Sequence, residues 1–373
     1  MGADAQFAPS AQRATIRDVA AEAGVSTATV SRVLNDSGSV APQTRAVVLE
    51  VIERRGLTVR RRRAVSPRPL RDIVAVRCPY LLDDYFGVIL SGIERSLRQG
   101  GKVPLLSAEA LEGDEPSLPE LLKSEITEGA ILILPPEPRD VLADLRSTGF
   151  PFVVVDPRTA LPPDVAAVSA AHLAGARMAT EHLLQLGHTR IAAIVGPRNW
   201  IAADDRLLGY RAALAAADKL APEGLVQAGG EPTIAHGLAA ARVLLDLPEP
   251  PTAIVAFNDK MAIGAMQAAA ERGLRVPRHL SVVGFDDLEL SRVVAPQLST
   301  VRQPLKEMAR LGVQLLLRLI DKREIDTLHV ELATELVLRA STGPPPRQPL
   351  ADGIPASGCS APSSSGAGII RIE

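Results

Sequence analysis

Several features that restrict function are missing from this 373-residue chain. It contains only two cysteines, Cys78 and Cys359, and Cys359 falls in a stretch rich in proline, serine and glycine, so we expect no structural disulfide. No apolar run reaches the roughly 18 residues that a membrane-spanning helix needs. The opening residues MGADAQFAPSAQR have no basic segment followed by an apolar one, which predicts no secretory signal. Together these absences predict a cytoplasmic protein.

Motifs of common enzyme classes are also missing. The chain has no GxxxxGKS/T phosphate loop, no GxGxxG after a strand, no HExxH and no GxSxG. We therefore expect no catalytic residues, no metal and no cofactor. Two alternatives stay open: an enzyme that acts on a sugar or nucleotide and carries an accessory helical head, and a binding protein without a DNA function. The missing signal peptide and the charge distribution argue against the second.

Charge is distributed unevenly along the chain. Residues 13–71 hold 12 arginines and 5 acidic residues, whereas the whole chain has a net charge of −2. The remainder of the chain is therefore acidic. A basic head attached to an acidic body is typical of a DNA-binding module joined to a second function. With 46% hydrophobic residues, the chain is long enough for two or three domains with a large core.

Residues 15–35, TIRDVAAEAGVSTATVSRVLN, predict two short helices joined by a tight turn. Thr15 is a candidate N-cap of the first helix, Gly24 ends it, and Ser26 caps the second. Helical spacing gives the first helix the apolar face Ile16, Val19, Ala20 and Ala23. The buried side of the second would be Val30, Val33 and Leu34. This is the helix-turn-helix pattern, although an ordinary pair of core helices can share it.

The exposed face of the second helix suits DNA. Short polar or small side chains and one arginine can reach base edges and phosphates there: Thr27, Ala28, Thr29, Ser31 and Arg32. A third helix follows, with Val48, Val51, Ile52 and Arg55 on one face. These features favour DNA binding over a pair of core helices.

TIRDVAAEAGVSTATVSRVLN, followed by VAPQTRAVVLEVIERRG, resembles the N-terminal domain of the LacI/GalR family of bacterial transcriptional regulators. The resemblance implies that Thr27 and Ala28 help to set operator preference and that Arg32 contacts bases. It also implies that a further set of residues holds phosphates or the local fold: Thr15, Ser26, Thr29, Ser31, Asn35 and Thr44.

The linker LTVRRRRAVSPRPLR departs from the family. The resemblance implies a hinge helix here that folds on DNA and wedges a leucine into the minor groove. Val65 is the nearest apolar candidate for that leucine. The arginine run Arg60, Arg61, Arg62 and Arg63 would grip phosphates or a narrow minor groove. The alternative is a solvated, flexible linker.

From residue 72 the chain alternates apolar runs with helical patterns. We predict strands at 72–77, 102–107, 129–134, 152–155, 190–196, 253–257 and 281–285. Helices are predicted at 87–99, 172–186, 204–217, 234–246, 259–272 and 304–320. This alternation indicates parallel sheets covered on both sides, and the number of units predicts two doubly wound lobes.

Polar and aromatic side chains follow the predicted strands, where such sheets bind ligands. The residues at these positions are Cys78, Tyr80, Asp156, Arg158, Trp200, Asn258, Asp259, Asp286 and Asp287. Carboxylates and amides bind hydroxyl groups, and an indole stacks on a sugar face, so the set suits a polyhydroxylated ligand.

The family resemblance extends over the body through TEHLLQLGHTRIAAIVGP, DDRLLGYRAAL, AFNDKMAIGAM and LRVPRHLSVVGFDDLELS. It implies an effector domain similar to the periplasmic sugar-binding proteins. The implied effector-binding residues are Phe86, Asp156, Arg206, Asn258 and Asp286, and the strand-end residues Cys78 and Trp200 complete the candidate site.

Some positions in the body have alternative interpretations. Ala170 and Ala171 stand where relatives often carry Asp-Asn, so a polar ligand or lobe contact is expected to be missing. Trp200 could instead pack against a loop, and Asp287 could be a surface or helix-cap residue. His182 and His188 are expected to be structural.

The predicted architecture is an all-α helix-turn-helix head plus an α/β body of two doubly wound parallel-sheet lobes, resembling type I periplasmic binding proteins. We expect a disordered tail (1–12), the DNA-binding domain (13–57), a basic hinge (58–71), an effector-binding and dimerisation domain (72–340) and a second disordered tail (341–373). Leucine heptads are absent, which predicts a homodimer. The predicted function is repression of a carbohydrate operon from a palindromic operator, relieved by a sugar-like effector.

Overall fold

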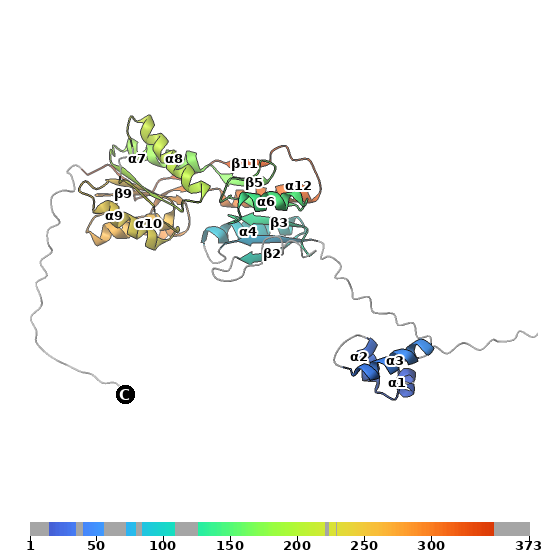
Figure 1. Ribbon diagram of the computed structural model, residues 1–373. Helices are drawn as coiled ribbons and strands as arrows, with labels where there is room; N and C mark the ends of the chain where they lie inside the picture. The colour runs from blue at the N-terminus through green and yellow to red at the C-terminus, as the bar shows by residue number, and fades with distance from the viewer. Residues whose placement is uncertain are drawn as a thin grey trace, which may run out of the picture. The chain divides into compact units, whose positions relative to one another are not determined.

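The computed structural model describes residues 15–34, 40–55, 72–79, 84–108, 126–220, 224–228 and 230–346. The chain forms two compact units, Met1–Arg71 and Asp72–Glu373 (Figure 1). Several positions predicted above lie outside the described residues, namely both outer tails, Asn35, Tyr80, Cys359, Val65 and the run from Arg60 to Arg63. No helix in the described part of the chain has the length and apolar character to cross a bilayer.

The first unit contains three helices: α1 (Ile16–Glu22), α2 (Thr27–Leu34) and α3 (Pro42–Arg54). Thr15 caps α1 through a capping box, in which its Oγ1 accepts from the Asp18 N–H at 3.4 Å and its own backbone N–H donates to Asp18 Oδ2 at 2.7 Å. The Thr15 hydroxyl also donates to Asp18 Oδ2, at 2.7 Å. These bonds lower the pKa of the exposed Asp18 carboxyl. Gly24 takes a left-handed φ of 65° in the turn, which glycine adopts without strain. The helix–turn–helix prediction is therefore confirmed.

The core of this unit is small. It contains seven buried side chains: Val19, Ala20, Val30, Val33, Val48, Val51 and Ile52. Ile16, which helical spacing places on the same face of α1 as Val19 and Ala20, is 42% exposed and is not part of this core. Ile16 is the first residue of a seven-residue helix and lies beyond the edge of the small core. Glu22 of α1 is bridged by Arg54 and Arg55 at the end of α3, which ties the two helices together.

The first lobe of the second unit is a six-stranded sheet in the order β11-β5-β4-β3-β1-β2, and all its strands are parallel. Its strands are β1 (Ile73–Cys78), β2 (Val103–Ala108), β3 (Gly129–Ile133), β4 (Phe152–Val155), β5 (Ala166–Ala170) and β11 (His329–Leu332). Helices α4 (Asp84–Gln99) and α12 (Leu305–Ile320) pack together on one face, and α6 (Arg139–Ser147) covers the other. Alternate strand residues thus enter two separate cores.

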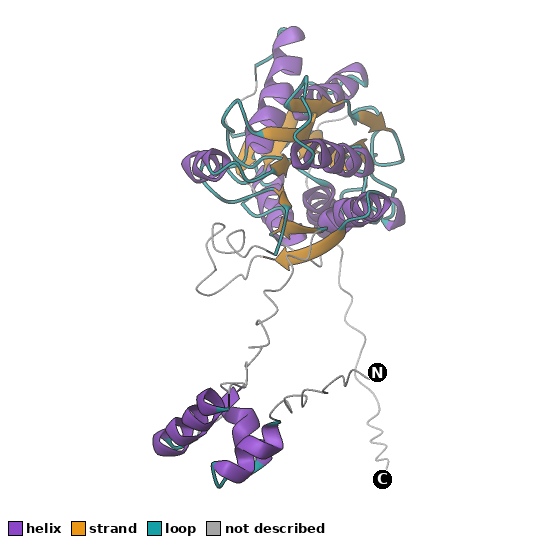
Figure 2. Cartoon of the chain, turned by 90° about the vertical axis from the view of Figure 1, so that its right-hand side faces the viewer, coloured by secondary structure: helices purple, strands orange, loops and turns teal. Residues whose placement is uncertain are grey.

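The second lobe is a six-stranded sheet in the order β12-β10-β9-β8-β6-β7, in which only β12 is antiparallel. Its strands are β6 (Ile191–Val195), β7 (Val226–Ala228), β8 (Ala253–Ala256), β9 (Ser281–Asp286), β10 (Ser299–Arg302) and β12 (Glu335–Val337). Helices α7 (His172–Gln185) and α8 (Ile201–Ala216) lie on one side of β9, and α9 (Ile234–Leu245) and α10 (Asp259–Glu271) on the other (Figure 1). The short α11 (Leu290–Val293) follows β9. Figure 2 shows helices flanking the strands of this unit. The prediction of two doubly wound lobes is confirmed.

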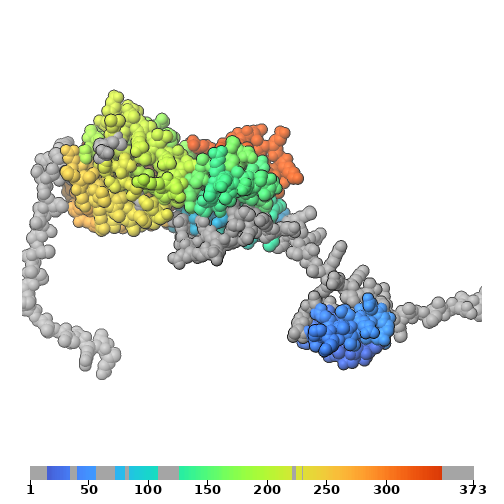
Figure 3. All heavy atoms as spheres, in the orientation of Figure 1, coloured from blue at the N-terminus to red at the C-terminus, as the bar shows by residue number. Residues whose placement is uncertain are grey.

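The chain passes between the lobes three times: from β5 to α7, from β10 to α12 and from β11 to β12. The late α12 and β11 therefore return to the first lobe, and Figure 3 shows their orange atoms beside the green atoms of that lobe.

The body also extends beyond residue 340, although the sequence predicts that the tail starts at residue 341. Ser341 is buried and donates to the Val282 carbonyl at 2.6 Å, and the Gly343 N–H donates to Ser281 Oγ at 3.0 Å.

Candidate functional site

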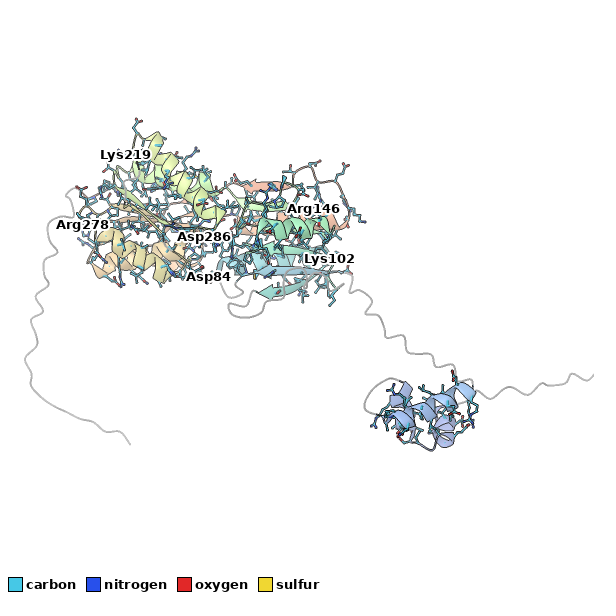
Figure 4. All side chains as sticks on the ribbon, in the orientation of Figure 1. Asp84, Lys102, Arg146, Lys219, Arg278 and Asp286 are labelled. Atoms are coloured by element: carbon cyan, nitrogen blue, oxygen red, sulfur yellow. The ribbon has the colours of Figure 1, made fainter. Side chains whose placement is uncertain are left out.

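A pocket opens between the two lobes, at the carboxyl ends of their strands. It encloses about 540 Å³ of atom-free space, part of which is open to solvent. Its lining comes from both lobes: Tyr85, Phe86, Leu134, Asp156, Trp200, Ala202, Arg206, Pro232, Phe257, Asn258, Lys260, Asp286 and Leu288. Figure 4 labels Asp286 where the lobes meet. A pocket at this place is expected, because ligands of doubly wound sheets bind outside the strand ends.

Arg206, on α8, is the central cation of the pocket. It is 8% exposed, and its guanidinium stacks 3.7 Å from the centroid of the Phe285 ring and 4.4 Å from that of Phe257. Nη1 donates to the Phe257 carbonyl, and Nη2 lies 3.9 Å from Asp286 Oδ1. Burial lowers the pKa of Arg206, while Asp286 and Asp156 counteract that effect. Aromatic faces and buried acceptors thus hold one charged group rigidly in the pocket wall.

Asp156, at the end of β4, is the acid of the first lobe. Both of its oxygens accept hydrogen bonds: Oδ2 from the Tyr85 hydroxyl at 2.6 Å and Oδ1 from His172 Nε2 at 2.8 Å. Burial alone would raise the pKa of Asp156, but His172, Tyr85 and Arg206 outweigh it and hold that pKa below its ordinary value. Burial raises the pKa of Tyr85 well above its usual range, and Asp156 raises it further. The pair is therefore an ionised carboxylate beside a neutral phenol.

The loop after β9 supplies the acid of the second lobe. Asp286 has a φ of 113° and Asp287 a φ of 57°, conformations that are unusual for residues other than glycine and cluster at functional sites. Asp286 Oδ1 accepts from Gln303 Nε2 at 2.7 Å. Asp259 lies under this loop and accepts from the Leu288 N–H at 2.9 Å. Burial and the neighbouring Asp286 raise the pKa of Asp259 well above its ordinary value, which favours a neutral carboxyl.

Aromatic side chains form the apolar part of the wall. Trp200 is 8% exposed and meets Phe257 edge-to-face, with the ring centroids 6.1 Å apart. The guanidinium of Arg158 lies 5.2 Å above the Trp200 ring, and the Arg158 carbonyl accepts from the Ile201 N–H at 2.9 Å across the two lobes. Asn258 caps α10, its Oδ1 accepting from the Met261 N–H at 2.9 Å.

The structure brings six of the seven predicted effector-site residues together: Phe86, Asp156, Trp200, Arg206, Asn258 and Asp286. It does not bring Cys78 there. Cys78 is fully buried, because it continues the alternate face of β1 that packs Val74 and Val76 into the core. Asp287 lies outside this pocket, and its carboxylate binds Arg292, Arg302 and Arg339.

Ala170 and Ala171 provide no polar side chain after β5, and whether a ligand contact is missing there stays a prediction, but the residue that follows them makes a polar contact at the strand ends of the first lobe. His172 opens α7 directly after Ala170 and Ala171 and hydrogen-bonds to Asp156. Residue patterns also missed Tyr85, Phe257 and Lys260 as lining residues. Phe257 and Lys260 flank the predicted Asn258 in sequence, which is the signal that could have found them. His188 is buried and structural, as expected, with bonds to Thr252, Ser281 and the Gly343 carbonyl.

The candidate DNA-binding surface lies on α2 of the first unit. Thr27, Ala28 and Arg32 are exposed, and Thr29 and Ser31 are partly exposed. Ser26 caps α2, since its Oγ accepts from the Thr29 N–H at 3.1 Å. Thr15 is exposed and Thr44 partly exposed, at the starts of α1 and α3 respectively. Helix N-termini and short hydroxyl side chains of this kind suit phosphate groups.

This fold combines a helix-turn-helix head with a two-lobed binding domain, the architecture of a ligand-responsive DNA-binding regulator. Comparison with known proteins agrees with this architecture. Residues 15–57 match the family of bacterial regulatory proteins, lacI family, and residues 180–342 match the periplasmic binding protein-like domain. The HTH-type transcriptional regulator DegA of Bacillus subtilis is 33% identical over 337 residues, covering 89% of this chain and 99% of DegA.

Two solved structures extend the likeness to three dimensions. The complex of the transcriptional regulator CelR with cellobiose has a TM-score of 0.67 at 32% identity and covers 88% of this chain and 100% of CelR. The lac repressor dimer bound to operator and the anti-inducer ONPF has a TM-score of 0.66 at 28% identity, covering 89% and 100%. The chain belongs to the LacI family of bacterial transcriptional regulators.

Proposed function

We propose that this protein is a dimeric repressor that binds a palindromic operator in the bacterial cytoplasm and is released by a neutral, sugar-like effector. The observation that carries the proposal is the pocket itself. Its two acids, Asp156 and Asp286, come from opposite lobes, and Arg206, which lines the pocket together with a second basic residue, Lys260, is already engaged with protein acceptors and aromatic rings. The genes that it represses would then form a carbohydrate-utilisation operon.

The wall chemistry favours hydroxyl groups over anions. Carboxylate and amide oxygens at Asp156, Asp286 and Asn258 accept from hydroxyls, whereas an anionic ligand would meet two carboxylates in a partly desolvated space. Trp200 and Phe86 add apolar faces of the kind on which the C–H faces of a sugar ring pack. The similarity to CelR, whose solved complex contains cellobiose, supports the same class of ligand.

Enzymatic function is disfavoured by the arrangement around His172. Its Nε2 faces Asp156 and its Nδ1 accepts from Arg206 Nη2 at 3.2 Å, so neither nitrogen is available as a general base. DNA recognition follows from the exposed face of α2, where Arg32 can reach a guanine and Ala28 a thymine methyl group. A two-fold dimer imposes its symmetry on the operator, which accounts for a palindrome; the lac repressor to which the chain is similar was solved as a dimer on its operator.

The test uses the full chain and its single tryptophan, Trp200, which lies in the pocket. An operator selected from random DNA is bound to the protein, and neutral sugars, nucleosides and sugar acids are screened for fluorescence change and operator release. A neutral sugar should do both. Asp286→Asn should weaken that sugar at least about tenfold, the order expected for a lost charged hydrogen bond, and leave operator binding intact.

Asp246→Asn is the matched control, since Asp246 pairs with Arg272 on the surface and lies outside the pocket. Preferential release by sugar acids, turnover of any sugar, or normal sugar affinity in Asp286→Asn would overturn the proposal.

A further inference from the structure

His172 stands where the chain first passes between the lobes. β5 of the first lobe ends at Ala170, and α7 of the second lobe begins at His172. The intervening Ala171 N–H donates to the carbonyl of Leu332, at the end of β11, at 2.8 Å, so two of the three crossovers touch here. The His172 side chain is 4% exposed and faces inward.

The two ring nitrogens of His172 contact different lobes. Nε2 lies 2.8 Å from Oδ1 of Asp156, which follows β4 in the first lobe. Nδ1 lies 3.2 Å from Nη2 of Arg206, on α8 in the second lobe. Arginine can only donate, so Nδ1 must accept and the proton must sit on Nε2, where it is donated to Asp156. His172 therefore bridges one polar pocket residue of each lobe, with one ring nitrogen facing Asp156 and the other facing Arg206.

We infer that His172 is a positioning residue that sets the lobe arrangement in which the pocket is complete, and so couples effector binding to operator release. The inference rests on the proposed function, because it concerns the same pocket. Asp156 retains Tyr85, and Arg206 retains the Phe257 carbonyl, when the bridge is absent. Each lobe thus keeps its own polar anchor, and what is lost is one buried side-chain link between the lobes.

The surroundings of His172 support this role. The Phe285 ring lies beside the imidazole, with the ring centroids 6.0 Å apart and the planes tilted by 43°. A β-carbon added at Gly175, one turn along α7, would lie 2.9 Å from Phe285 and 2.8 Å from Thr334 Oγ1, in the crossover from β11 to β12. Close packing therefore surrounds the start of α7, between the crossover from β5 to α7 and the crossover from β11 to β12.

Because the bridge needs one hydrogen-bond donor and one acceptor, two substitutions of His172 can test it. His172→Gln keeps both functions on a neutral side chain, whereas His172→Leu keeps comparable volume and has neither. His188→Gln is the matched control, because His188 is also buried, and its ring nitrogens contact Thr252, Ser281 and the Gly343 carbonyl within the second lobe.

The first measurement needs no ligand: hydrogen exchange of the full-length protein at the three crossovers. Exchange at residues 170–175, 302–305 and 332–335 should rise by about tenfold or more in His172→Leu, the order expected when hydrogen bonds to charged groups are lost. His172→Gln and His188→Gln should exchange there like the unmodified protein. Unchanged exchange in His172→Leu, or equal acceleration in all three variants, would overturn the inference.

The second measurement is the coupling factor, the ratio of operator affinities without and with saturating neutral sugar. His172→Leu should bring this factor down about tenfold or to unity, and His172→Gln should restore it to within about threefold of the original. Coupling retained in His172→Leu overturns the inference. If no neutral sugar affects the unmodified protein, the proposed function fails instead, and the exchange measurement still decides the role of His172.

Discussion

Replacing Asp287 by asparagine is expected to destabilise the body far more than removing an exposed acid with similar arginine contacts. Asp287 has a side chain that is 1% exposed and accepts from Arg302 Nε at 2.7 Å, from Arg292 Nη2 at 3.1 Å and from Arg339 Nη2. Arg339 also donates to the Leu298 carbonyl at 2.7 Å. One buried carboxylate thus anchors the loop after β9, the start of α11 and the segment that follows β12.

The size of the stability loss in Asp287→Asn depends on which of the three arginines remain buried. Removing one partner of a buried ion pair costs about 3–5 kcal/mol when the other charge stays buried. The side chains of Arg302 and Arg292 are 43% and 57% exposed, so water stabilises their charges, whereas that of Arg339 is only 12% exposed. Asparagine keeps the volume and one acceptor oxygen. We therefore expect a loss of about 2–4 kcal/mol in the free energy of unfolding.

The assay is urea unfolding of the full chain followed by Trp200 fluorescence, which reports on the body alone because the chain has a single tryptophan. Asp246→Asn is the matched control: Asp246 accepts from Arg272 at 2.7 Å, yet its side chain is 64% exposed, so about 0–1 kcal/mol is expected. Equal losses in the two variants, or a loss under about 1 kcal/mol for Asp287→Asn, would refute the argument that burial decides the cost.

The stabilisation that Asp287 provides is also expected to depend on pH. Burial alone would raise the pKa of Asp287, but hydrogen bonds from Arg339, Arg302 and Arg292 outweigh it and hold that pKa below its ordinary value. Since the folded pKa is below the unfolded value of about 3.9, the stabilisation is fully present above that pH and is lost as the pH falls through the folded pKa. The gap in stability between the original chain and Asp287→Asn should therefore be constant from neutral pH down to about pH 5 and narrow in more acidic solution.

Three further outcomes concern DNA. Arg32→Ala should weaken binding to the specific operator by about 1–3 kcal/mol and affect random DNA less; equal losses in a gel-shift assay would make Arg32 a phosphate contact only. Replacing Arg60, Arg61, Arg62 and Arg63 with alanine should lower DNA affinity and flatten its dependence on salt, and an unchanged slope would mean that the run does not contact DNA. Effector and operator should each reduce the other's affinity, by one factor that linkage makes common to both, and a factor of one in equilibrium titrations would contradict the coupling.

The sequence predicted most of the sheet strands because buried parallel strands are continuous apolar runs. β3 and β4 are fully buried and lie at or within one residue of the predicted ranges. Five strands were missed. β7, β11 and β12 are short and partly exposed, with the sequences VQA, HVEL and ELV. β5 and β10 are mostly buried, but their sequences AAVSA and STVR consist largely of alanine, serine and threonine rather than a run of large apolar residues. Such strands form because a neighbouring strand offers hydrogen-bond partners, which a local sequence pattern does not show.

Some residues of the candidate site could likewise be predicted from the sequence, and others could not. Asp156, Asn258 and Asp286 could be predicted because topology alone brings the ends of parallel strands to one edge. His172 could not, because its role depends on Asp156 of the other lobe being within 2.8 Å. Cys78 also ends a strand, but the two-residue alternation of β1 turns its side chain into the core. The ends of the parallel strands therefore indicate where the pocket lies, but the direction of each side chain decides whether that residue lines it.

The loop after β9 joins the pocket to the segments that connect the lobes. Asp286 lines the pocket and accepts from Gln303, which lies in the crossover from β10 to α12. Its neighbour Asp287 binds Arg302, whose Nη1 donates to Glu335 at the start of β12 at 2.9 Å, after another crossover. A ligand can shift a conformational equilibrium only through a difference in its contacts in the two states. A ligand that contacted both Asp286 on one lobe and Asp156 on the other would have such a difference if a change in the crossovers altered the distance between those acids. The fold thus connects the candidate pocket directly to the segments that join the lobes.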